Sequence, residues 1–87
     1  MKKGGRGVLN ENDMARYVRT ALDNYFSDLD GEDPSCPVYD MVIHCVEKPL
    51  IETVLHHAGG NQTRAAELLG LNRNTLRRKL LDHKLTT

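Results

Sequence analysis

The sequence predicts an all-α protein with four helices per chain. Two long segments repeat apolar residues at the three- and four-residue spacing of an amphipathic helix. Two shorter helical segments follow near the C-terminus, and a turn that contains glycine separates them. Glycine and proline residues also stand between the longer segments, where they end helices.

The first long helix is predicted to begin at Asp13, with Asp13 or Asn12 as its N-cap. Its apolar residues follow at steps of three and one from Met14 to Leu29, which places them on one face. Residues 1–12 contain three glycines and few large apolar side chains, so we expect a flexible N-terminal arm there.

A loop from about Asp30 to Pro37 precedes the second long helix, which is expected from about Val38 to His57. Pro49 lies in the middle of this segment and lacks the N–H that a helix interior requires. Because the apolar pattern continues in phase on both sides of Pro49, we expect a kink rather than a break. Gly59 and Gly60 then end the helix, since glycine readily takes the left-handed conformation.

The apolar residues of the second helix cover more than one face, which two helices of a monomer cannot bury. A chain of 87 residues is also marginal as a monomer, and this one has one phenylalanine, three tyrosines and no tryptophan. We therefore assign residues 13–58 to dimerisation. The positions expected at the dimer interface are Val18, Leu22, Phe26, Val42, Val46, Leu50 and Val54.

Residues 60–85 are predicted to form a helix-turn-helix. Asn61 caps a short helix from Gln62 to Leu69, and Asn72 caps a second one from Arg73 to about His83. A motif of this kind places its second helix in the major groove of DNA. The apolar residues expected to pack the two helices are Ala65, Ala66, Leu68, Leu69, Leu71, Leu76 and Leu80.

Charge is distributed unevenly, although the net charge of the chain is zero. Residues 1–58 carry six Lys or Arg against ten Asp or Glu, which gives −4, whereas residues 59–87 carry six against two, which gives +4. This asymmetry is typical of a protein whose basic end contacts nucleic acid. A basic helix that is only solvated gives the same pattern, so charge alone does not decide.

Side chains of the second short helix are expected to read DNA. Arg73 matches the two acceptors of guanine, Asn74 matches the donor–acceptor pair of adenine, and Arg78 can reach a base or a phosphate. Phosphate candidates outnumber these base candidates, which favours substantial affinity with relaxed sequence preference. The residues expected to contact phosphates are Asn61, Thr63, Arg64, Asn72, Thr75, Arg77 and Lys79.

Several of these residues have local alternatives. Asn61 and Asn72 are helix caps first, and Thr75 is as well placed to cap the second short helix as to contact a phosphate. Arg64 could instead pair with Glu67, three residues along the same helix.

Other function classes find little support in the sequence. Ser27 and Ser35 do not lie in a nucleophile elbow. His44 and Cys45 point about 100° apart on a helix and lack a zinc spacing, so we expect no enzyme activity, no metal and no cofactor. No apolar run reaches the length of a membrane span and no signal-peptide core follows Met1, so we expect a cytoplasmic protein. A module that binds an acidic protein partner is the remaining alternative.

Residues 60–80, GNQTRAAELLGLNRNTLRRKL, closely resemble the helix-turn-helix of the bacterial Fis family, the factor for inversion stimulation. The same motif is similar to the C-terminal DNA-binding domain of NtrC-type activators. Two further stretches favour the Fis family. Residues 21–31, ALDNYFSDLDG, resemble its first helix and the following turn, and residues 46–50, VEKPL, resemble its proline-kinked second helix.

The resemblance implies a homodimer in which the first two helices of each chain intertwine into a four-helix core, with one helix-turn-helix at each end. In this family the recognition helices lie closer together than one turn of B-DNA, about 34 Å, so the DNA bends and its central minor groove narrows. A nucleoid-associated transcription regulator that binds degenerate sites is implied. The DNA contacts of the family fall on all the base and phosphate contacts predicted above for the two short helices, except Asn74 and Lys79.

The chain departs from the best-studied family members at several positions. Residues 1–13 are shorter than the arm that touches a recombinase. In the turn before the helix-turn-helix, Gly59 replaces a basic residue that helps contact RNA polymerase, and His56 replaces an amide. Neither partner is therefore assumed for this chain. Leu81 and Asp82 stand where those members have lysines, which lowers the expected phosphate affinity.

Overall fold

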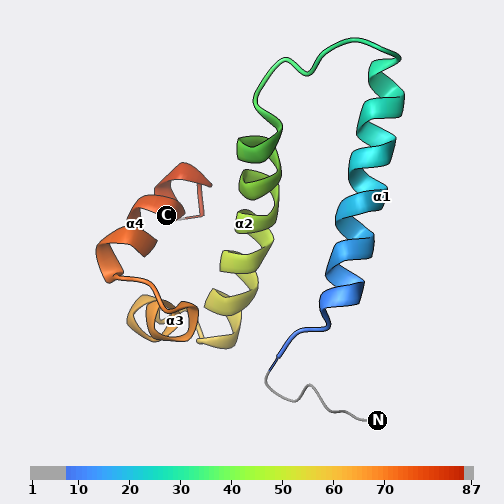
Figure 1. The fold of residues 1–87 in the computed structure, drawn as a ribbon. Coiled ribbons are helices and arrows are strands. Elements are labelled where there is room, and N and C mark those ends of the chain that lie inside the picture. Colours follow the sequence, from blue (N-terminus) through green and yellow to red (C-terminus); the bar gives the residue numbers. More distant parts are fainter. Residues whose placement is uncertain (1–7, 86–87) are drawn as a thin grey trace. The chain divides into compact units, whose positions relative to one another are not determined.

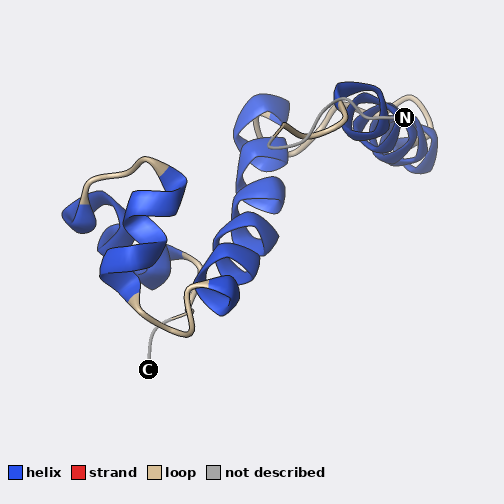
Figure 2. Ribbon diagram, turned by 90° about the horizontal axis from the view of Figure 1, so that it is seen from below, coloured by secondary structure: helices blue, strands red, loops and turns tan. Residues whose placement is uncertain are grey.

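The computed structural model describes residues 8–85, and its regular elements there are four α-helices. Figure 1 shows them in chain order: α1 (Glu11–Leu29), α2 (Val38–His57), α3 (Gln62–Leu69) and α4 (Arg73–Asp82). Loops join the helices, and no strand occurs between residues 8 and 85 (Figure 2). The predicted all-α class with four helices is confirmed, while residues 1–7 of the predicted arm lie outside the described part of the chain.

The helices belong to two compact units of the chain. The first unit ends at Ser35 and contains α1, and the second begins at Cys36 and contains α2, α3 and α4. The second long helix thus shares a unit with the two short helices of the predicted helix-turn-helix. Helix α2 is therefore the element on which α3 and α4 are built.

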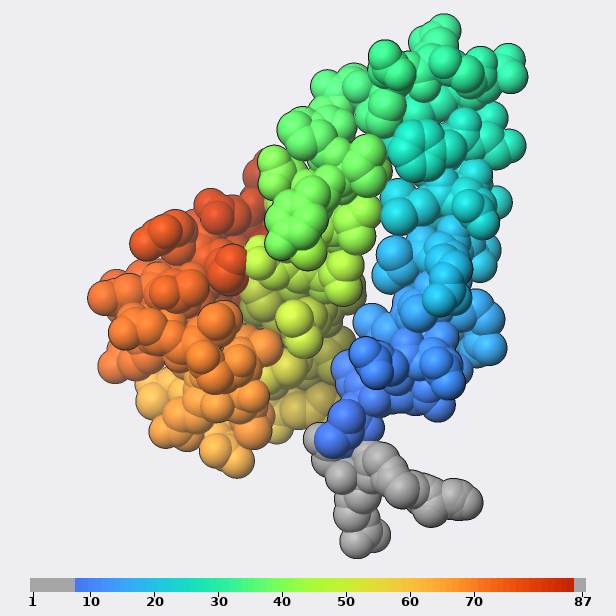
Figure 3. Space-filling view, viewed as in Figure 1, coloured from blue at the N-terminus to red at the C-terminus, as the bar shows by residue number. Residues whose placement is uncertain are grey.

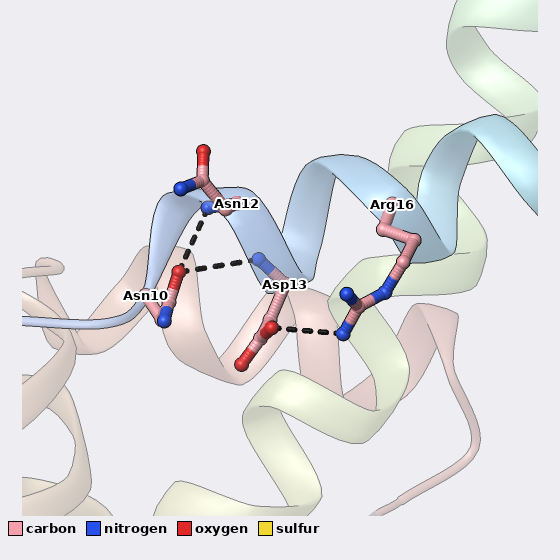
Figure 4. Close-up of polar contacts among 4 residues, drawn as sticks. All are labelled: Asn10, Asn12, Asp13 and Arg16. Atoms are coloured by element: carbon pink, nitrogen blue, oxygen red, sulfur yellow. Dashed lines mark hydrogen bonds and ion pairs between the residues drawn. The ribbon is translucent and has the colours of Figure 1, made fainter.

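Helix α1 begins at Glu11, earlier than predicted, because Asn10 is its N-cap. The Oδ1 atom of Asn10 accepts hydrogen bonds from the backbone N–H groups of Asn12 at 2.9 Å and Asp13 at 3.3 Å (Figure 4). The predicted caps Asn12 and Asp13 are therefore wrong, since both lie inside the helix and donate to Asn10. The Asp13 carboxylate instead accepts a bond from Arg16 Nη2 at 2.9 Å.

Helix α2 continues through Pro49 without a break and has the predicted bounds, Val38–His57. At its C-terminal end, the Gly60 N–H donates to the carbonyl of Leu55 at 3.0 Å, the long hydrogen bond of a Schellman motif. Gly59 and Gly60 both have positive φ, 66° and 82°, so the predicted glycine terminator is confirmed. The chain reverses direction at this turn, and the next helix, α3, packs against α2.

The buried core of the second unit joins all three of its helices. Its members are Ile51 of α2, Ala65 and Ala66 of α3, and Leu76 and Leu80 of α4, each at most 2% exposed. In the space-filling view of Figure 3, the orange side chains of α3 and α4 gather against the yellow and green surface of α2. The small alanines let α3 approach its neighbours closely, as predicted.

One residue of the predicted packing set lies on the surface. Leu68 is 49% exposed, so the expectation that it packs in the core is wrong. Ala65 and Ala66 face the core, with Leu69 half-buried beside them. At 100° per residue, Leu68 points about 110° away from the middle of the face formed by Ala65, Ala66 and Leu69. Leu71, in the turn, is half-buried.

Replacing Gly70 with alanine is expected to lower the free energy of unfolding by about 1–2 kcal/mol, the cost of a left-handed backbone at a residue with a side chain. Gly70 has a φ of 74°, and a Cβ atom there would meet nothing within 4 Å, so no steric clash adds to this cost. Urea unfolding followed by circular dichroism measures the difference. Gly70→Asn is the control and should lose less, because asparagine tolerates this conformation. Equal stability of Gly70→Ala and wild type would contradict the assignment.

Candidate nucleic-acid interface

The two short helices form the predicted helix-turn-helix, with residues 70–72 as the turn. The Arg64 N–H donates to Asn61 Oδ1 at 3.1 Å, and the Asn74 N–H donates to Asn72 Oδ1 at 2.8 Å. Both predicted asparagine caps are therefore confirmed. Capping uses the side-chain oxygen, so each exposed NH₂ group can still donate to a phosphate at a helix N-terminus.

Helix α4 turns its inner face toward the core that it shares with α2 and α3, through Leu76 and Leu80, which are each 1% exposed. At 100° per residue, Arg78 points about 180° away from that face and Asn74 about 140° away, so both side chains lie on the outer face. Of the predicted DNA contacts, the exposed residues are Asn61, Thr63, Arg64, Asn72, Arg73, Asn74, Arg77 and Arg78, and the half-buried ones are Thr75 and Lys79.

Arg64 forms the ion pair with Glu67 that the sequence offered as an alternative to a phosphate contact. Its Nη1 atom lies 3.3 Å from Glu67 Oε1, and the two side chains are 58% and 62% exposed. An exposed ion pair of this kind contributes little, about 0–1 kcal/mol. The guanidinium of Arg64 can therefore exchange Glu67 for a phosphate at small cost.

Lys79, which is predicted to contact a phosphate, forms an ion pair within the chain. Its Nζ atom lies 2.7 Å from Oε2 of Glu47 on α2, and the two side chains are 30% and 23% exposed. The other oxygen of the same carboxylate, Oε1, lies 2.8 Å from Nε2 of His83. The carboxylate of Glu47 thus joins α2 to two residues at the end of α4.

His83 is the buried polar residue of this contact. The residue is 4% exposed, and its ring lies 4.3 Å from the ring of His44 with a tilt of 30°. Nε2 faces the carboxylate of Glu47, while the buried Nδ1 has no hydrogen-bond partner among the described residues. Sequence patterns did not indicate Glu47 or His83 as functional, because the contact joins residues more than thirty positions apart. The one available signal was the four-residue spacing of Lys79 and His83, which places both on one side of α4.

The carboxylate of Glu47 stays ionised more readily than a free glutamate. The hydrogen bond from Lys79, followed by the one involving His83, lowers the pKa of Glu47 from its ordinary value of 4.5. Desolvation of the carboxylate opposes this effect without reversing it. Near neutral pH, Glu47 therefore carries a negative charge that balances the ammonium of Lys79.

Stability is expected to decline as the pH falls below 4.5, in part because of Glu47. Since its pKa is lower in the folded chain, the unfolded chain takes up this proton first. The contribution is complete above pH 4.5 and is lost as the pH falls through the lower pKa of the folded state. Urea midpoints measured from about pH 6 to about pH 3 follow the loss. Glu47→Gln should flatten this profile, and exposed Glu52→Gln should not; identical profiles for both variants would contradict the assignment.

The predicted dimer-interface positions are only partly covered within one chain. Helix α1 has no buried side chain, and Phe26 of α1 and Leu50 of α2 are 47% and 49% exposed. Val54 packs against the core formed by α2, α3 and α4. The half-buried positions of the predicted interface are Val18, Leu22, Val42, Val46 and Val54.

The fold and the site together define a class of protein. Helix α4 packs its inner face into the core shared with α2 and α3 and presents Asn74 and Arg78 on its outer face, the arrangement of a helix-turn-helix protein. Between residues 8 and 85, no helix has the combination of length and apolar character that a membrane span needs.

Comparison with known proteins places the chain in a particular family. The family model for "Bacterial regulatory protein, Fis family" matches residues 44–83. A relative from Neisseria meningitidis serogroup A, named as a Fis-like DNA-binding protein, is 55% identical over 73 residues, which cover 84% of this chain and 91% of the relative. A relative of the same kind from Ralstonia nicotianae is 53% identical over 77 residues, 88% of this chain and 99% of the relative.

A third relative carries the family name itself. The DNA-binding protein Fis of Glaesserella parasuis is 49% identical over 67 residues, which cover 77% of this chain and 67% of that protein. The chain described here belongs to the Fis family. The resemblance predicted from residues 60–80 is therefore confirmed.

Proposed function

We propose that this chain acts as a homodimer that binds and bends double-stranded DNA, with α4 of each protomer in successive major grooves. The observation that carries the proposal is the exposed surface of α4, to which Arg73, Asn74, Arg77 and Arg78 all contribute side chains. Arginine and asparagine are the side chains that pair with guanine and adenine in the major groove. The names of the relatives as DNA-binding proteins support the same role.

Base reading is assigned to three residues of α4, Arg73, Asn74 and Arg78. The proposed phosphate contacts surround them at the N-termini and flanks of α3 and α4, where backbone N–H groups favour anions. Lys79, also predicted as a phosphate contact, is a special case because Glu47 holds its ammonium group. The other phosphate contacts are Asn61, Thr63, Arg64, Asn72, Thr75 and Arg77.

A second copy of the chain is the proposed cover for the apolar side chains of α1 and α2. Met14 and Phe26 of α1 are 39% and 47% exposed, and Ile43 and Leu50 of α2 are 43% and 49% exposed. Full burial of one such side chain contributes about 1.5–3 kcal/mol, so an interface that covers all four is a strong driving force. This agrees with the four-helix core that the family resemblance implies.

Bending is what the family resemblance implies, because recognition helices that lie closer together than one turn of B-DNA can enter successive major grooves only if the DNA bends. Contacts to phosphates fix position and carry no sequence information, so the protein would depend on how easily a site deforms. Degenerate sites and a nucleoid-associated, regulatory role in the bacterial cytoplasm are the expected consequences.

A gel-shift series with circularly permuted DNA fragments tests the proposal, because a bent complex migrates according to the position of its site. Light scattering gives the mass of the free protein, which should be twice the 9.8 kDa of one chain. Titrations at about 50 and 200 mM salt should show a steep loss of affinity, as expected when phosphates are neutralised.

Each part of the proposal has an outcome that would refute it. Equal mobility of all permuted fragments would exclude bending, and a mass of one chain would exclude the dimer. Binding that is insensitive to salt would contradict DNA recognition and favour a module for an acidic protein partner.

A further inference from the structure

We propose that Glu47 is a positioning residue for the recognition helix, and that Lys79 and His83 bind its carboxylate rather than DNA phosphates. The inference rests on the proposed DNA binding and concerns how α4 is held for it. Glu47 lies on α2, outside the helix-turn-helix, yet it reaches Lys79 at 2.7 Å and His83 at 2.8 Å. We call these three residues the carboxylate anchor.

The carboxylate anchor acts together with the apolar core to fix α4. Glu47 lies four residues before Ile51, so the two side chains stand one turn apart on the same side of α2. Ile51 belongs to the core that contains Leu76 and Leu80, whereas Glu47 meets Lys79 and His83. Two successive turns of α2 therefore hold α4, one through the apolar core at Ile51 and the other through the carboxylate of Glu47.

The two donors also fix the rotation of α4 about its own axis. Lys79 and His83 are one helical turn apart, and each is hydrogen-bonded to a different oxygen of the Glu47 carboxylate. Turning α4 in place would break both contacts at once. Since Asn74 and Arg78 point outward from the same helix, this rotation determines where their side chains meet DNA.

Lys79 is a poor phosphate ligand in this arrangement. Its ammonium is only partly accessible, with a side chain 30% exposed, and its charge is balanced by Glu47 at 2.7 Å. Moving it to a phosphate would leave a carboxylate that is 23% exposed without its cation, which is unfavourable. Arg77 and Arg78 are exposed and supply positive charge without that loss.

His83 contributes a directed hydrogen bond rather than a surface charge. Because the ionised Glu47 can only accept, Nε2 of His83 must carry the hydrogen. The His44 ring covers one side of the His83 ring, at 4.3 Å between centroids. The imidazole is therefore oriented on two sides, by the carboxylate and by His44.

The first test is a double-mutant cycle in urea unfolding without DNA, using Glu47→Gln, Lys79→Met and the double variant. The double variant should lose less stability than the sum of the single losses, because either change already breaks the pair. The control pair is Asp13→Asn with Arg16→Met, an ion pair of 2.9 Å whose side chains are 49% and 65% exposed. Its cycle should show little coupling. Additive losses at Glu47 and Lys79 would overturn the anchor.

The second test measures DNA affinity at a temperature where circular dichroism shows every variant folded. Glu47→Gln and Lys79→Met should each lower the ratio of specific to non-specific affinity by about fivefold or more, as expected when base-reading side chains are misplaced. Lys79→Met should leave the slope of log affinity against log salt unchanged. Arg78→Met, which removes an exposed cation, should reduce that slope by about 0.9 if Arg78 contacts a phosphate, and should reduce the specificity ratio if it contacts a base.

Three results would overturn the positioning role. Lys79→Met would lower the salt slope by about 0.9 if Lys79 contacts a phosphate. Glu47→Gln would tighten all binding if its charge merely repelled DNA. Folded variants with unchanged specificity would show that the anchor serves stability alone. A wild-type chain that does not bind DNA would refute the proposed function and the positioning role together, whereas the unfolding cycle would still report the Glu47–Lys79 contact.

Discussion

Replacing Leu80 with alanine is expected to lower the free energy of unfolding by about 2–5 kcal/mol, the usual cost of truncating a buried leucine. Leu80 is 1% exposed and belongs to the core in which α4 meets Ile51 of α2. Truncation removes apolar contacts and leaves a cavity that neighbouring side chains fill only partly. Urea unfolding at fixed protein concentration measures the loss, because the stability of a dimer depends on concentration.

Leu81→Ala is the matched control for this prediction. Leu81 is the next residue of α4 and undergoes the same chemical change, but it is 60% exposed. Its loss of stability should stay within about 0.5 kcal/mol. Similar losses at both positions would mean that α4 does not pack on α2 through the face described here.

Replacing Arg73 with alanine is expected to abolish the preference for guanine near each end of the DNA site, at a cost of about 1–3 kcal/mol on preferred sequences. Arg73 is the first residue of α4 and is exposed beside the cap Asn72. N-terminal residues of a recognition helix meet base edges, and arginine pairs with two acceptors of guanine. Competition between sites with and without the guanine measures the change.

Arg77→Ala is the control for Arg73→Ala, since Arg77 is exposed on the flank of the same helix and is proposed to contact a phosphate. It should weaken all sequences alike. Both variants should keep wild-type unfolding midpoints, because neither side chain is buried. Equal, sequence-independent losses in the two variants would show that Arg73 reads no base.

The bounds of the last three helices were accessible from the sequence because their signals are local. Asn61 and Asn72 each precede a helix that they cap, and glycine follows the ends of α2 and α3. The start of α1 was harder, since Asn10, Asn12 and Asp13 are all residues that can cap a helix. Which of them caps depends on how far the helix extends, and apolar periodicity does not report that.

The carboxylate anchor was not accessible in the same way. Considered on its own helix, Lys79 is a basic residue beside other basic residues, so its assignment to phosphates followed from α4 alone. The structure adds the opposing helix, which brings Glu47 within 2.7 Å of Lys79. Helical spacing fixes which residues share a face, but not which residue of another helix that face meets.

Helix α2 has a mechanical consequence for the proposed complex. It carries apolar residues proposed for the dimer and, through Ile51 and Glu47, also holds the recognition helix at two levels. In such a dimer the distance between the two recognition helices is fixed by the protein. The DNA duplex must then deform to match that distance. Sites with flexible pyrimidine–purine steps between the contacted grooves would then bind more tightly than stiff ones, even where no side chain touches those steps.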